Sequence, residues 1–225
     1  MSSSKKLFDF HWPVAIPAAL FVIAFVTITL IVGEPIKTYF THIQTILYDN
    51  IGWFFVSIVN IMLFASVVLI ISPFGKIKLG GAKASKDFSD FAWYSMLFSA
   101  GMGIGLIFYG AAEPLQHFAN PPIPVASDVK AAEQAFKFTL LHYGFHPWAV
   151  YGIVALAFAF FTFNRKLPLA VRSLFAPLLG RRIHGVFGHT VDALAVVACL
   201  FGLSTTLGFG AQQVGAGLEY LFDIP

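Results

Sequence analysis

Large aromatic side chains with polar tips gather around a proline between residues 142 and 151. Pro147 has no backbone N–H to donate to the carbonyl of Tyr143, so a helix here must kink or open. On an ideal helix Tyr143, Trp148 and Tyr151 fall within an arc of about 140°. Three converging π faces bind a quaternary ammonium group well, because a trimethylated cation has no hydrogen to donate and is attracted by the ring quadrupoles. Packing and anchoring at a membrane interface are the alternative role of these rings.

A second candidate site is the glycine-rich stretch 98–110, in which Gly101, Gly103 and Gly105 occupy alternate positions. Each glycine costs a helix interior about 1 kcal/mol relative to alanine. A close-packed helix seam would use only two of them, because Gly103 lies nearly opposite the other two on a helical wheel. A locally unwound helix uses all three, and irregular backbone at membrane depth survives only beside a cavity or within protein. We therefore expect a substrate or ion site here.

The other polar side chains in the apolar segments are few. His142 and His146 could share a metal ion, but no Asp, Glu or Cys in the same segment completes a ligand set. We expect these histidines to form hydrogen bonds across helices or at the outer rim instead. The hydroxyls of Ser204, Thr205 and Thr206 could bind a hard cation, or they could bond back to carbonyls of their own helix.

Two carboxylates lie near the ends of apolar segments. Glu113, followed by Pro114, is expected to end a membrane span, and Asp192 is expected to cap the start of another. The sequence therefore offers little material for a proton relay through buried carboxylates. It also contains no motif that pairs a catalytic nucleophile with a general base, and no cofactor-binding loop. We therefore expect neither an enzyme nor a cofactor.

The composition is typical of an integral membrane protein. Hydrophobic residues make up 58% of the chain and charged residues 11%, against roughly 25% charged in soluble domains. The net charge of +3 is too small and too scattered to indicate nucleic-acid binding. The single cysteine excludes an intrachain disulfide. We expect a multi-pass protein of the cell membrane, with the lipid bilayer as its surroundings.

Five apolar segments are long enough to cross a bilayer, so the sequence predicts an all-α fold with five transmembrane helices. The fifth is too long for one straight span, and we expect a break or bend at Gly208 and Gly210, with strong tilt as the alternative. Before it, residues 167–184 mix apolar and basic side chains, which favours an interfacial amphipathic helix over a plain loop. The predicted spans are residues 13–32, 52–74, 91–112, 136–163 and 191–222.

The distribution of positive charge predicts the orientation. Most of the 14 Lys and Arg residues lie in the N-terminal tail, in residues 75–90 and in residues 164–190, which the five spans place on one side. Only Lys37, Lys130 and Lys137 lie on the other side. Because positive charge is retained in the cytoplasm, we expect a cytoplasmic N-terminus.

Two motifs resemble a known family. The run Phe98 to Gly105, continuing through Glu113 and Pro114, is similar to the third-span signature of the betaine/choline/carnitine transporter family, and the run His142 to Tyr151 resembles its fourth-span aromatic motif. The resemblance covers essentially the whole chain. It implies secondary transport of trimethylammonium solutes, two leading helices before two inverted five-helix repeats, and assembly as a homotrimer. Residues 1–90 would then hold the leading helices, and residues 91–225 the first three helices of the core.

The resemblance also implies roles for single residues. Tyr143 stands where many members have Trp, which keeps a π face and adds a hydroxyl. Gly105 occupies a position where proton-driven or antiport members tend to depart from glycine, so its presence favours sodium coupling. Sodium would act as the coupling ion, held by the backbone carbonyls of Ser99 and Met102. The implied substrate-binding residues are Gly101, Met102, Gly103, Gly105, Tyr143, Trp148 and Tyr151.

Transporters of this family need both repeats, whereas the five predicted spans supply two leading helices and part of the first repeat. We therefore expect the chain to be the N-terminal part of a longer transporter, or a truncated product, that does not transport alone. The expected activity is sodium-coupled import of glycine betaine or a related trimethylammonium osmolyte for osmotic protection. A choline or carnitine transporter is the alternative within the family, and a non-transporting membrane subunit is the alternative from another class.

Overall fold

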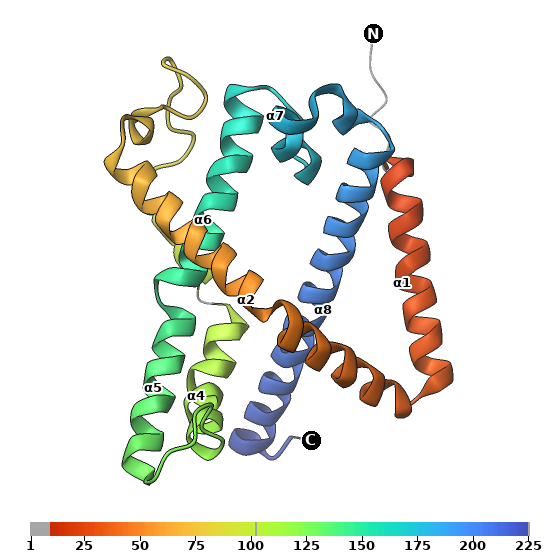
Figure 1. Cartoon of the computed structure of the whole chain (residues 1–225), viewed down its shortest axis with the longest axis vertical. Helices are drawn as coiled ribbons and strands as arrows, with labels where there is room; N and C mark the ends of the chain where they lie inside the picture. The colour runs from red at the N-terminus through yellow and green to blue at the C-terminus, as the bar shows by residue number, and fades with distance from the viewer. Residues whose placement is uncertain (1–9, 102, 225) are drawn as a thin grey trace. The chain divides into compact units, whose positions relative to one another are not determined.

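The computed structural model of the chain describes residues 10–101 and 103–224, with the backbone alone at Ile104. The described residues form helices and no strands, which confirms the predicted all-α fold (Figure 1). Four helical stretches are long and apolar enough to cross a membrane, and a bent pair of helices makes a fifth when it is counted as one span. The structure is therefore consistent with the predicted multi-pass membrane protein.

Two compact units make up the described chain. The first contains the residues up to Phe55 together with Ala157–Phe201. The second contains Val56–Leu156 together with the residues after Phe201. The glycine stretch and the aromatic run both belong to the second unit.

Helix α1 (Trp12–Val32) matches the predicted first span and ends at Gly33, whose φ of 67° favours glycine. A turn leads directly into helix α2 (Pro35–Ile71), although the sequence predicted a second span only from residue 52 (Figure 1). The helix thus begins before the predicted span, because proline suits the first turn of a helix. Polar residues in this early part are also accommodated: the Thr41 hydroxyl, for example, donates to the carbonyl four residues before it.

The predicted third span is a broken helix. Helix α3 (Asp90–Gly101) follows a short 3-10 turn (Pro73–Lys76) and a loop. Helix α4 (Ile104–Ala119) begins just beyond α3, and the two helices are bent by 43° relative to each other. The interruption falls within the glycine stretch, where the sequence predicted it.

Helix α4 does not end at Glu113 and Pro114, so the predicted end of the third span is wrong. Pro114 lies inside the helix and leaves the carbonyl of Gly110 without its helical donor. The helix continues because the other backbone groups still pair within it, as they must in an apolar environment. Glu113 therefore lies within a helix and is buried.

Helices α5 (Asp128–Tyr143) and α6 (Phe145–Ala159) take the place of the fourth span predicted at residues 136–163. The chain opens at Gly144, three residues before Pro147. This confirms the predicted opening of the helix beside that proline, and it places Tyr143 on a different helix from the two aromatic residues that follow.

Helix α5 begins earlier than the sequence predicted because Ser127 caps it. The Ser127 hydroxyl accepts a hydrogen bond from the backbone N–H of Lys130. The loop before α5 is held by Gln134, whose side chain bonds the N–H and the carbonyl of Ile123 at 3.3 and 3.0 Å. Helices α4 and α5 consequently pack along each other as an antiparallel hairpin (Figure 1).

The sequence predicted one amphipathic helix over residues 167–184, but the structure has no continuous helix there. A π-helical turn (Phe160–Asn164) ends α6, and three short helical segments follow. Gly180 has a φ of 52°, which a continuous right-handed helix cannot include. The location of these three short segments at the membrane surface stays a prediction. The three segments are Val171–Phe175, α7 (Ala176–Leu179) and Gly180–His184.

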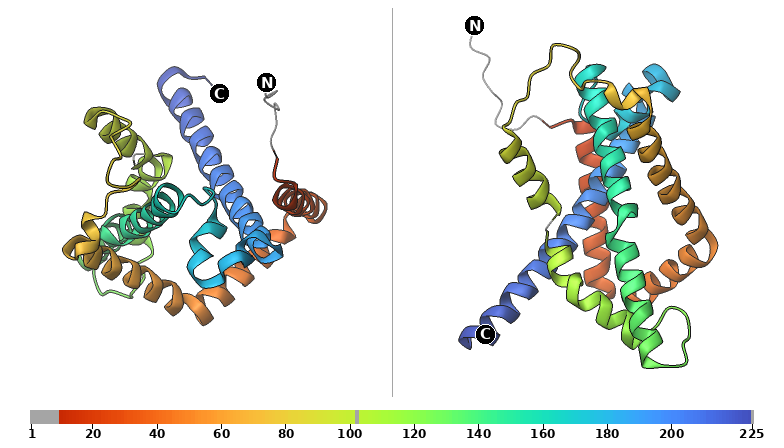
Figure 2. Two further views of the ribbon diagram at one scale, coloured as in Figure 1. Left: turned by 90° about the horizontal axis from the view of Figure 1, so that it is seen from above. Right: turned by 90° about the vertical axis from the view of Figure 1, so that its left-hand side faces the viewer.

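Helix α8 (Val186–Phe222) runs without interruption through Gly208 and Gly210, so the predicted break is wrong (Figure 2). Two glycines cost a helix about 2 kcal/mol, which is less than leaving several backbone groups unpaired in an apolar environment. Thirty-seven residues of helix extend about 55 Å, well beyond an apolar core of about 30 Å. Strong tilt of this helix stays a prediction.

Asp192 is not a helix cap, because α8 begins at Val186 and includes Asp192 in its second turn. Its buried carboxylate lies 3.2 Å from the Arg172 guanidinium and accepts the Arg172 backbone N–H at 2.9 Å. The guanidinium also lies 3.1 Å from His189 and 3.4 Å from His11. This cluster fastens the start of α8 to the segment that contains Arg172 and to the start of α1.

Removing one partner of this ion pair should destabilise the protein strongly. Asp192→Ala leaves the Arg172 charge almost enclosed and unpaired, which typically costs about 3 to 5 kcal/mol. We expect a clear fall in the thermal unfolding midpoint of the purified protein in detergent. Asp87→Ala, at an exposed loop position, is the control and should leave the midpoint almost unchanged. Equal midpoints for the two variants would contradict a stabilising role for the Arg172 and Asp192 pair.

Candidate functional site

The interruption between α3 and α4 exposes backbone groups that a continuous helix would pair. The Gly103 carbonyl accepts the N–H groups of Leu106 and Ile107 at 3.1 and 3.3 Å and so begins α4. Ser99 lies in the last turn of α3, where carbonyls have no helical donors and the helix dipole is negative. This turn is therefore suited to a cation. The contribution predicted for Met102 falls on a residue outside the described part of the chain.

Gly101 and Trp148 are in close contact. A Cβ atom on Gly101 would lie 2.6 Å from the Cη2 atom of the Trp148 ring, far inside van der Waals distance. Among the described residues, no atom lies within 4 Å of a Cβ added at Gly103 or Gly105. The three glycines therefore differ in role: Gly101 admits an aromatic ring, whereas a side chain at Gly103 or Gly105 would meet none of the described atoms.

The aromatic residues meet the glycine stretch at two points. The Tyr143 hydroxyl donates to the carbonyl of Gly105 at 3.4 Å, while Trp148 covers Gly101. The Trp148 and Tyr151 rings contact each other edge to face, with centroids 6.1 Å apart. Because Gly144 separates α5 from α6, the single-helix wheel used for the prediction does not apply across it. The structure thus brings the predicted residues to the interrupted helix by two separate contacts.

The Trp148 and Tyr151 side chains are 50% and 52% exposed. Part of each of these two residues is therefore accessible from outside the protein. Accessible aromatic rings of this kind are suited to contact with a cation.

Phe209 on α8 also packs against the glycine-rich stretch, a contact that the sequence did not predict. Its ring stacks on Phe108, with centroids 5.0 Å apart and planes 21° apart, and meets Tyr109 edge to face at 5.5 Å. From the sequence, the glycines on either side of Phe209, Gly208 and Gly210, predicted a break in the helix. In the structure they flank a ring that packs on another helix. The contact fixes the first turns of α4 against α8.

The expected hydrogen bonding of His142 across helices is confirmed. Its Nδ1 atom lies 2.8 and 2.9 Å from the two carboxylate oxygens of Glu113 on α4. The Glu113 carboxylate also lies 3.4 Å from Nε2 of His117, one turn further along α4. Within the described residues, no group of three or more His, Cys, Asp or Glu side chains is arranged to hold a metal ion.

Of Ser204, Thr205 and Thr206 on α8, Thr206 forms the hydrogen bond to a carbonyl of its own helix that the sequence offered as the alternative to cation binding. The Thr206 hydroxyl donates to the Gly202 carbonyl at 2.9 Å, within the same helix. A cation-binding role for Ser204 and Thr205 stays a prediction.

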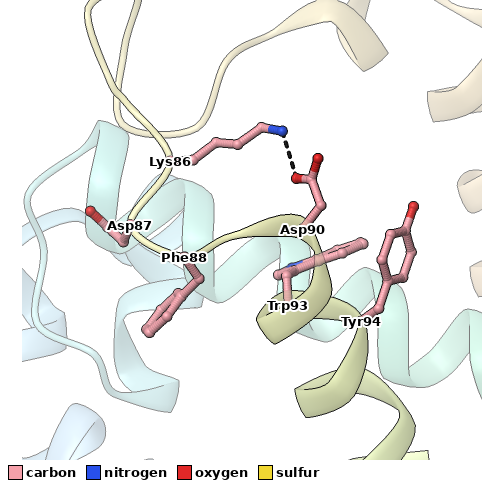
Figure 3. A pocket seen from close by; sticks show the side chains of 6 residues that line it. All are labelled: Lys86, Asp87, Phe88, Asp90, Trp93 and Tyr94. Carbon is pink, nitrogen blue, oxygen red and sulfur yellow. Dashed lines mark hydrogen bonds and ion pairs between the residues drawn. The ribbon is translucent and has the colours of Figure 1, made fainter.

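A hollow of about 470 Å³ lies at the start of α3 and is lined by acidic and aromatic side chains (Figure 3). Its Asp90 carboxylate is already paired with Lys86 at 2.6 Å, four residues earlier. Both side chains are largely exposed, so this pair contributes little to stability. Because that carboxylate is already neutralised, we do not place the substrate here.

Comparison with known proteins identifies the class. The model of the betaine/carnitine/choline family of transporters matches residues 13–225. A glycine betaine transporter of Vibrio parahaemolyticus is 45% identical over 222 residues, covering 96% of this chain and 42% of the relative. The glycine betaine transporter OpuD of Bacillus subtilis is 44% identical over 183 residues, covering 81% of this chain and 36% of the relative. A glycine betaine/proline/choline transporter of Vibrio parahaemolyticus is 38% identical, over 96% of this chain and 42% of its own length.

These matches, with the apolar helices, define a multi-pass membrane protein of a transporter class and not an enzyme. The chain belongs to the betaine/carnitine/choline transporter family, which confirms the resemblance found in the sequence. It spans about two fifths of the length of the relatives it matches.

The contact between Gly101 and Trp148 can be tested directly. Gly101→Ala places a methyl group against the indole, so we expect the ring to move and its fluorescence emission maximum to shift. Gly110→Ala, where an added Cβ meets no atom within 4 Å, should leave the spectrum unchanged. The measurement uses protein in which the other tryptophans, Trp12, Trp53 and Trp93, are replaced by phenylalanine. Identical spectra for the two alanine variants would show that Gly101 does not pack on Trp148.

Proposed function

We propose that this chain forms part of a secondary transporter that imports glycine betaine or a related trimethylammonium solute in osmotic protection. The observation that carries the proposal is the position of Trp148, whose half-exposed ring lies on Gly101 at the interrupted helix with Tyr151 beside it. The names of the relatives support glycine betaine as the substrate. Choline is a second candidate, favoured by the relative whose name includes it.

In this proposal the trimethylammonium group lies against Trp148, Tyr151 and Tyr143. Each aromatic contact contributes about 0.5 to 2 kcal/mol to binding, since the positive group is attracted by the ring faces. Gly101, Gly103 and Gly105 keep the backbone accessible to the remainder of the solute. Met102 completes the proposed set.

We propose sodium as the coupling ion, bound by the backbone carbonyls of Ser99 and Met102. The last turn of α3 supports this proposal because its carbonyls lack helical donors and because it forms the negative end of a helix dipole. Sodium and substrate would then bind next to each other, and their joint binding would favour closure of the site.

The remaining features of the proposal concern the whole transporter. Residues 1–90 would form the tail and leading helices, and residues 91–225 would begin the core, with the N-terminus in the cytoplasm. The working transporter would be a homotrimer of complete chains, each carrying a second repeat that supplies the rest of the site.

Loss of the Trp148 ring should weaken transport of trimethylammonium solutes. With the protein expressed from its complete reading frame, Trp148→Ala should raise the KM for labelled glycine betaine between about twofold and thirtyfold. Trp148→Phe should recover part of the affinity. Trp93→Ala is the control, because Trp93 is 49% exposed and lies at the hollow that we do not assign. Unchanged affinity in Trp148→Ala would exclude the aromatic site.

Replacing sodium by potassium at constant pH should abolish glycine betaine uptake into cells that lack their own betaine carriers. The larger ion fits poorly in a site made of a few fixed carbonyls. The initial rate of uptake is measured, with a protonophore added in a parallel sample. Uptake without sodium that follows a pH gradient would overturn sodium coupling.

A further inference from the structure

The hydrogen-bonded pair of Glu113 and His142 lies on the α4–α5 hairpin, next to the proposed site but outside it. The Glu113 side chain is 10% exposed, whereas that of His142 is 63% exposed. The histidine therefore reaches a nearly enclosed carboxylate from the open side of the hairpin. Both groups border a hollow of about 580 Å³, which is also lined by Tyr109, Gln116, His117, Phe138 and Leu141.

A carboxylate in such surroundings needs a partner, because removing a charge from water is costly unless the charge is paired and hydrogen-bonded. His117 lies on the same helix as Glu113 and is more distant, at 3.4 Å, so it cannot join two helices. His142 is at 2.8 Å and belongs to α5. The Glu113 and His142 pair is therefore a short polar contact that joins α4 to α5.

The same hairpin carries one contact of the proposed site. His142 is followed directly by Tyr143, whose hydroxyl reaches the Gly105 carbonyl at 3.4 Å. That distance is at the long end for a hydrogen bond, so this contact alone would position the ring weakly. The Tyr143 side chain also interacts with Glu113, and the His142 and Tyr143 rings lie 4.8 Å apart.

We infer that Glu113 and His142 are positioning residues for substrate binding. Their pair fixes α4 against α5 and thereby holds the Tyr143 ring at Gly105, where the proposed trimethylammonium group binds. Neither residue touches the substrate. The inference rests on the proposed function, because it concerns affinity for the same solute.

The structure suggests a sharp test with two polar replacements of His142. Asparagine carries its amide nitrogen two bonds beyond Cβ, as histidine carries Nδ1, whereas the glutamine nitrogen lies one bond further out. In the protein expressed from its complete reading frame, His142→Gln and Glu113→Gln should raise the KM for glycine betaine about tenfold with little change in Vmax. His142→Asn should keep KM close to the wild-type value. Glu133→Gln, at an exposed carboxylate on α5, is the control and should change neither parameter.

A double-mutant cycle then tests whether the pair acts through Tyr143. Tyr143→Phe removes the hydroxyl that reaches Gly105, so His142→Gln should raise KM much less in that background than in the wild type. Additive effects, an unchanged KM in His142→Gln, or equal KM values for the asparagine and glutamine variants would each overturn the inference.

Failure of the proposed function gives a different result. If the wild-type protein takes up no trimethylammonium solute, the proposed function and the substrate role of the pair are both overturned. Wild-type uptake with any of the contradicting variant results overturns the positioning role alone. Thermal unfolding midpoints of Glu113→Gln, His142→Gln and the double variant separately measure whether the two side chains interact.

Discussion

Backbone hydrogen bonding in an apolar environment is the constraint on which this structure depends. A helix that crosses a membrane must pair its own N–H and carbonyl groups, so an interruption is tolerated only where other protein or a ligand satisfies the freed groups. At the interruption between α3 and α4, other protein lies against both helices. Trp148 packs on Gly101 at the end of α3, and the Tyr143 hydroxyl donates to the Gly105 carbonyl in the first turn of α4.

The same constraint explains which helix-breaking residues take effect. Pro147 stands in the first turn of α6 with Gly144 just before it, and the chain opens there. Pro114 stands inside α4, and Gly208 and Gly210 stand inside α8, yet both helices continue. One proline or glycine within a helix costs less free energy than leaving several backbone groups unpaired. A helix therefore breaks only where more than one such residue occurs together.

Polar side chains hold the apolar helices together in each unit. Asp192 joins the start of α8 to Arg172, and Glu113 joins α4 to α5 through His142. Both carboxylates are buried and lie within helices, so neither serves as the helix terminus that its neighbouring residues suggested. In surroundings with few polar groups, such pairs set the register of two segments more strongly than apolar packing, which has no preferred direction.

The sequence by itself determined the membrane class, the all-α fold, the family and the two places where helices open. These features follow from composition and from the local conformational preferences of glycine and proline. Such preferences act within one stretch of chain and do not depend on distant residues. It placed the ends of α2, α4 and α8 wrongly, because those ends depend on capping and on backbone pairing that hydropathy does not record. Only the tertiary structure decided that Trp148 meets Gly101, that Phe209 packs on Phe108, and that Glu113 binds His142. The partners of these last two contacts are distant in sequence, and nothing local to either residue specifies the other.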